Sequence, residues 1–151
     1  MGSNLLGANA PFSAKLTLLI ELAMGVALTA GAWLARRRKY RQHAWCQSTV
    51  VLLNLVVIGI AMVPSLQMHV LPKIPARLTR AFYALATIHA VLASAAELAA
   101  VYVLLVAGTR LVPEWLRFYD FKKVMRGVLV LWWVALSFGV ATYLRWYISW
   151  R

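Results

Sequence analysis

Four long apolar runs constrain what this chain can fold into. They cover about residues 16–34, 45–63, 81–106 and 127–148. Each run reaches the roughly 20 apolar residues that a helix needs to cross the hydrocarbon core of a bilayer. None alternates as a strand would, and a backbone in lipid must satisfy its own hydrogen bonds. The sequence therefore predicts an all-α fold, a four-helix transmembrane bundle that forms a single domain over residues 1–151.

Positive charges cluster beside the ends of these runs. The chain has 16 Lys and Arg residues but only four acids, and 63% of its residues are hydrophobic. Five cations lie between residues 36 and 41 and five more between 110 and 126, which leaves six of the 16 elsewhere. Lys and Arg accumulate on the cytoplasmic side of membrane proteins. We therefore expect these two connections in the cytoplasm and both termini outside.

The same clusters indicate a surface for lipid headgroups or a partner protein. A nucleic-acid binder gathers its cations on one polar face, whereas here they flank bilayer-length segments, so we expect no nucleic-acid partner. Besides the lipid bilayer, we expect other membrane protein subunits as partners. The candidate surface consists of Arg36, Arg37, Arg38, Lys39, Arg41, Lys122, Lys123 and Arg126.

The remaining connections differ in character. Residues 64–80 contain three prolines, so we expect an irregular loop there. Residues 113–121 mix aromatic and charged side chains after Pro113, which predicts a short helix lying at the membrane interface. The single Cys46 excludes an internal disulfide, and no nucleophile–base motif or phosphate loop is present. We therefore predict no enzyme and no catalytic residues.

Polar residues within the apolar runs are costly in lipid and mark candidate sites. At 100° per residue, two sets share a helix face. If the two faces meet, they form a polar track from the middle of the bilayer to the cytoplasmic surface. The sets are His43, Gln47 and Asn54 on the second helix and His89, Ala93 and Glu97 on the third.

His89 has three readings: it ligates haem or a metal, relays protons, or bonds to a neighbouring helix. A bis-histidine haem with His43 is geometrically poor, because the two residues differ in depth by about 15 Å. Met24 lies nearer to the depth of His89, so a His/Met haem site remains open. His89, His43 and Met24 are thus the candidate cofactor-binding residues, with b-type haem as the candidate cofactor and no metal site assigned.

The acidic and amide groups form a candidate proton relay of Glu97, Asn54 and Glu21. Glu97 could carry a proton, but pairing with a cation or with His43 is the favoured reading. Glu21 has no obvious partner on its own helix and is expected to contact Asn54 or the outer loop. Cys46 is read as a packing residue.

Three stretches resemble the bacterial membrane family "domain of unknown function 420". They are RRRKYRQH at residues 36–43, IHAVLA at 88–93, and the basic run before the last helix. The family pattern has a further histidine in that basic run, where this chain reads YDFKKVMR at 119–126. The resemblance implies a small multi-pass protein of the bacterial cytoplasmic membrane, linked to haem-copper terminal oxidases, with His43 and His89 as the matching residues.

Together these observations favour an accessory or assembly subunit of a membrane respiratory complex. One alternative is an electron-transfer subunit that carries haem or protons through His89. Another is a small oligomeric transporter, which is disfavoured because four helices without broken segments leave little room for a substrate.

Overall fold

The computed structural model describes residues 10–117 and 119–148, and within them every regular element is a helix. Four helices are long and apolar enough to span a membrane, which confirms the predicted all-α four-helix bundle. The elements are α1 (Phe12–Arg36), α2 (Tyr40–Val57), the π-helical turn η1 (Ile58–Met62), α3 (Val63–Ser65), the π-helical turn η2 (Leu66–Val70), the 3-10 turn η3 (Leu71–Lys73), α4 (Ala81–Gly108), the 3-10 turn η4 (Glu114–Leu116) and α5 (Phe121–Tyr147).

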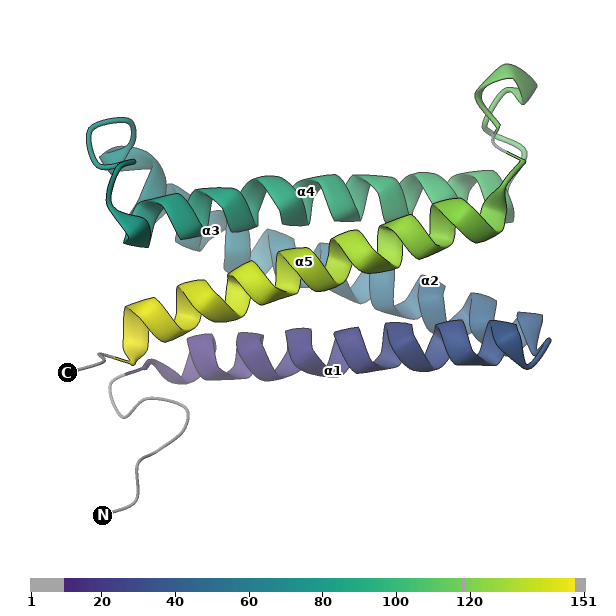
Figure 1. Cartoon of the computed structure of the whole chain (residues 1–151), viewed down its shortest axis with the longest axis horizontal. Helices are drawn as coiled ribbons and strands as arrows, with labels where there is room; N and C mark the ends of the chain where they lie inside the picture. Colours follow the sequence, from purple (N-terminus) through teal and green to yellow (C-terminus); the bar gives the residue numbers. More distant parts are fainter. Residues whose placement is uncertain (1–9, 118, 149–151) are drawn as a thin grey trace, which may run out of the picture.

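The four long helices run antiparallel to their neighbours in the chain (Figure 1). α4 packs along α5 and α1 packs along α2, while α1–α5 and α2–α4 contacts close the bundle. Arg38 adopts a left-handed φ of 59° in the tight turn between α1 and α2. The start of α1 and the end of α5 lie at one end, called here the open end; the basic connections lie at the other, called the basic end (Figure 1). Which end faces the cytoplasm stays a prediction from the charges.

The second membrane-spanning helix is longer than the sequence suggests. We expect it to stop near residue 63 and give way to an irregular loop, but this expectation is wrong, because helical turns continue to Lys73. Pro64 lies in the first turn of α3, where a missing N–H is tolerated, and π-helical turns on both sides absorb the interruption. Val70 is then buried against Tyr83 and Ala86 of α4. Tertiary packing thus extends the helix beyond its local signal.

The connection between α4 and α5 contains less helix than expected. Among its described residues, which leave out position 118, the helical part is η4, a single 3-10 turn. Arg117 holds the connection together by donating from Nη2 to the Thr109 carbonyl oxygen at 2.7 Å and from Nε to that of Val112 at 3.2 Å. Trp115 and Tyr119 remain 81% and 90% exposed, as aromatic residues at a membrane interface would be.

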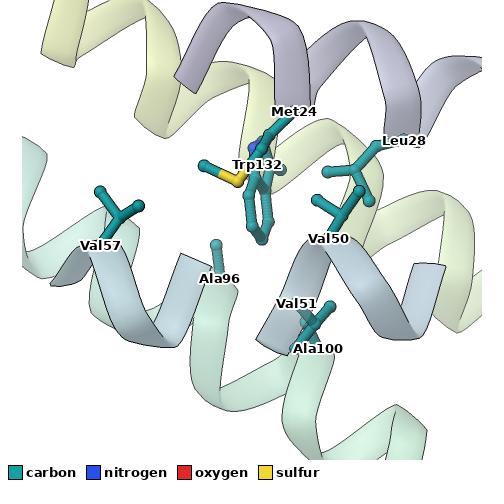
Figure 2. Packing of buried hydrophobic residues seen from close by; sticks show 8 residues of the cluster. All are labelled: Met24, Leu28, Val50, Val51, Val57, Ala96, Ala100 and Trp132. Atoms are coloured by element: carbon teal, nitrogen blue, oxygen red, sulfur yellow. The ribbon is translucent and has the colours of Figure 1, made fainter. Parts of the chain in front are cut away.

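The hydrophobic core lies in the middle of the bundle, where all four long helices meet (Figure 2). Only 22–28% of each spanning segment is buried inside the bundle, so most of the apolar surface faces outward. A water-soluble protein would not expose that much contiguous apolar surface, whereas a bilayer solvates it. The core side chains are Met24, Leu28, Val50, Val51, Val57, Ala96, Ala100 and Trp132.

Candidate functional site

A buried hydrogen bond joins the polar faces of α2 and α4. Nδ2 of Asn54 donates to Oε2 of Glu97 at 2.8 Å, and the two residues are only 6% and 4% exposed. This contact brings together one residue from each of the two faces predicted from helical phase, near the middle of the bundle. The favoured partner of Glu97 is wrong, however. Among the described residues, the partner of Glu97 is the side-chain amide of Asn54 and not a cation or His43, because Asn54 of α2 lies level with Glu97.

The rest of the predicted track faces a different helix. Nδ1 of His43 bonds to the Gly31 carbonyl oxygen at 2.7 Å, and Nε2 of Gln47 donates to that of Leu28 at 3.1 Å. Sγ of Cys46 contacts the Ala27 carbonyl oxygen at 3.3 Å, in keeping with a packing role. These three side chains therefore form a seam between α1 and α2. His43 helps to hold that seam and shares no cavity with His89.

The close approach at this seam gives the first testable prediction. A Cβ atom built on Gly31 would lie 2.5 Å from Nε2 of Gln47, whereas one on Gly127 of α5 would meet nothing within 4 Å. Gly31→Ala should displace the Gln47 amide from Leu28 and lower the free energy of unfolding by about 1 kcal/mol relative to Gly127→Ala. Unfolding in mixed micelles, followed by circular dichroism, measures the difference. Equal stability of the two variants would show that the seam hydrogen bond is unimportant.

A small cavity collects polar groups from three helices. Glu21 of α1, Asn54 of α2 and His89 of α4 line it, and its volume of about 20 Å³ suffices for one water molecule. Three nearby oxygens are buried without a hydrogen-bond partner in the described part of the chain: Oε1 of Glu21, Oδ1 of Asn54 and Oε1 of Glu97. Buried polar atoms of this kind usually bind water or a ligand. The structure thus brings together all three residues of the predicted relay.

A larger cavity opens above this cluster, toward the open end. It has a volume of about 550 Å³ and walls from α1, the segment 58–70, α4 and α5. Its lining is mostly apolar, whereas Glu21 and His89 line both cavities and so form the floor of the larger one. Small-molecule sites typically combine this volume with a few convergent polar groups.

His89 is held in one orientation by α5. Its Nδ1 lies 2.9 Å from the Ala135 carbonyl oxygen, which can only accept, so Nδ1 donates. In the neutral ring the lone pair is then on Nε2, for which the described residues supply no partner. A Cβ on Gly139 would lie 2.8 Å from Cε1 of His89, so only glycine lets α5 approach the ring this closely. A hydrogen-bonded Nδ1 and a bare Nε2 suit either a hydrogen-bond acceptor or a ligating imidazole.

The structure separates Met24 from His89. Met24 is 3% exposed within the hydrophobic core and lines neither cavity (Figure 2). The methionine that lines both cavities beside His89 is Met62. Sequence reasoning misses it because the expected helix ends near residue 63, which places Met62 at the membrane surface, whereas helical turns continue to Lys73. Gly139 was also missed. Its signal is the spacing of Ala135 and Gly139, four residues apart on one face of α5.

The eight candidate surface cations are all exposed, and they lie at the end of α1, in the turn that follows it and at the starts of α2 and α5. The Arg37 guanidinium lies 4.8 Å from the centre of the Trp33 ring, so a cation–π contact accompanies the cluster. Lys123 forms an exposed ion pair with Asp120 at 2.7 Å. The remaining basic groups are available to anionic lipid headgroups or to an acidic partner surface.

No group of three or more His, Cys, Asp or Glu side chains in the described ranges is placed to hold a metal ion. The arrangement is suited to binding an uncharged molecule at a polar floor inside the membrane. Comparison with protein families, with curated protein sequences and with solved structures finds no match to this chain.

Proposed function

We propose that this protein is an accessory or assembly subunit of a membrane redox complex, located in the bacterial cytoplasmic membrane. The observation that carries the proposal is the intramembrane cavity whose floor presents the bare Nε2 of His89. An imidazole held in one orientation in a preformed apolar pocket suits a site that binds a redox-active molecule but does not catalyse its reaction. The resemblance in residues 36–43 and 88–93 supports the same role.

The basic end supplies a second supporting feature. Exposed cations lie on both connections of the basic end, and electrostatic complementarity guides the docking of partner subunits. The outward-facing apolar surfaces of the helices leave room for contacts with other membrane helices as well as lipid. These features together fit a small protein that acts beside larger subunits.

Purification of the protein from its native membranes in a mild detergent tests the proposal. We expect a haem- or quinone-containing complex to co-purify with it, detected by absorption spectra and mass spectrometry. Replacing Arg36, Arg37 and Arg38 with Gln should reduce the recovered complex several-fold, because long-range attraction to the partner is lost. The matched control replaces Lys73, Arg77 and Arg80, exposed cations of the opposite end, with Gln.

Two results would contradict the proposal. The protein could purify alone under conditions that keep known complexes intact, with membrane respiratory rates unchanged after deletion of its gene. Alternatively, the two triple variants could lose the complex equally, which would mean that the basic end has no special role in docking.

A further inference from the structure

The larger cavity has polar groups at its floor but no Lys or Arg among the described residues of its walls. The polar groups of the floor are Glu21 and His89. Haem b carries two propionates, and burying their charge without a cation is costly. Its iron could take Nε2 of His89 as a ligand, but the described walls offer the propionates imidazole and hydroxyl groups, such as His69 and Thr142, and no Lys or Arg. The cavity therefore favours an uncharged ligand.

The floor offers hydrogen-bond acceptors. Nδ1 of His89 is occupied by the Ala135 carbonyl oxygen, so in the neutral ring Nε2 accepts. Oε1 of Glu21 is buried and has no partner among the residues that the structure describes. The unused Nε2 favours a ligand that brings a hydroxyl donor, and the carboxyl group of Glu21 offers a second polar contact in the same lining.

The position of the cavity indicates how such a ligand enters. Its walls include α1 and the segment 58–70. α1 and α2 run side by side near the basic end, and the chain that continues α2 through residues 58–70 then diverges from α1 toward the open end (Figure 1). The cavity is open rather than enclosed, and the helices around it face lipid. A ligand would therefore arrive from the hydrocarbon phase, with its polar group turned inward and an apolar tail left in the lipid.

We infer that this cavity binds a membrane-soluble isoprenoid quinol. One ring hydroxyl donates to Nε2 of His89, and the carboxyl group of Glu21 contacts the ligand's other polar atoms. A quinol is uncharged, carries two hydroxyl donors on an apolar ring and has a tail that can leave between α1 and the segment 58–70. The inference rests on the proposed function, since quinols are mobile hydrogen carriers of membrane redox complexes.

The redox state of the ligand gives the sharpest distinction. A quinone presents only carbonyl acceptors to the acceptor Nε2 of His89, whereas the quinol presents donors. The reduced form should therefore bind at least about tenfold more tightly, which is the effect of one hydrogen bond. An alcohol of similar length without the ring, 1-decanol, should bind weakly because it leaves the broad cavity unfilled.

The test uses the purified full-length protein in detergent micelles, with decylubiquinol and decylubiquinone as probes. Ligand binding raises the midpoint of thermal unfolding by an amount that grows with the logarithm of the ratio of ligand concentration to dissociation constant. We expect a clear shift with decylubiquinol, a much smaller one with decylubiquinone and 1-decanol, and a quinol affinity reduced about tenfold or more in His89→Phe. Trp45→Phe, on an exposed part of α2, is the control that should bind normally.

A second variant covers the case in which His89→Phe does not fold. Ala90→Phe keeps His89 and places a ring in the cavity that Ala90 lines, so quinol binding should be lost while the hydrogen bond to Ala135 remains. Equal affinity for quinone and quinol, full binding by Ala90→Phe, or a haem Soret band that disappears in His89→Phe would overturn the inference. Because the assay needs no partner, quinol binding by a protein that co-purifies with no redox complex would overturn the proposed function alone.

Discussion

Replacing Trp132 with alanine is expected to lower the free energy of unfolding by about 3–5 kcal/mol, the largest effect of any single change considered. Trp132 is 4% exposed and extends from α5 into the core, where Met24, Leu28 and Val50 surround it (Figure 2). Removal of the indole leaves a void among side chains from all four long helices. The neighbouring helices cannot close it without breaking their other contacts, so most of the lost packing energy remains lost.

Trp45→Ala provides the matched control. This indole is 70% exposed on α2, so lipid replaces its contacts and the change in unfolding free energy should be small. Denaturation in mixed micelles, monitored by far-ultraviolet circular dichroism, gives both values. If Trp132→Ala is no less stable than Trp45→Ala, the helices do not meet around Trp132 and the packing of the bundle is wrong.

Breaking the contact between Asn54 and Glu97 should have the second largest effect. Asn54→Leu leaves the Glu97 carboxyl group buried with neither oxygen bonded in the described part of the chain, because Oε1 already lacks a partner. We expect a loss of about 2 kcal/mol, since the desolvation of a buried polar group is no longer compensated. Glu97→Leu should cost a similar amount by leaving the Asn54 amide unpaired.

The double variant Asn54→Leu/Glu97→Leu distinguishes a hydrogen bond from simple packing. Replacing both partners with apolar groups removes the unsatisfied atoms, so the double variant should lose less stability than the two single variants added together. Thr87→Val serves as the control for a lone hydroxyl, because Thr87 donates to the Tyr83 carbonyl oxygen one turn earlier on its own helix α4. Strict additivity in the double variant would mean that the two side chains do not interact.

The sequence predicts the candidate site correctly where helical phase alone determines which residues can meet. It fails where the contact depends on which neighbouring helix a side chain faces. Phase places Asn54 and Glu97 on faces that can meet, and they do. It also places His43 on the Asn54 face, but a helix face is broad, and His43 turns to the Gly31 carbonyl oxygen of α1. Depth along the helix suggests Met24 as a companion of His89, yet the rotation of α1 directs Met24 into the core. Depth alone does not give that rotation.

The sequence by itself determines that the chain forms four apolar helices, because apolar runs of bilayer length that do not alternate as strands must satisfy their backbone hydrogen bonds within each segment. Only the tertiary structure decides that helical turns continue past Pro64 and that α1 and the segment 58–70 diverge around a cavity. Packing between helices also forms the floor of that cavity. The Ala135 carbonyl oxygen orients His89, and Gly139 leaves space for its ring. The reason is that local hydrophobicity specifies which segments are helical, whereas helix rotation and separation depend on side-chain contacts between segments far apart in the chain.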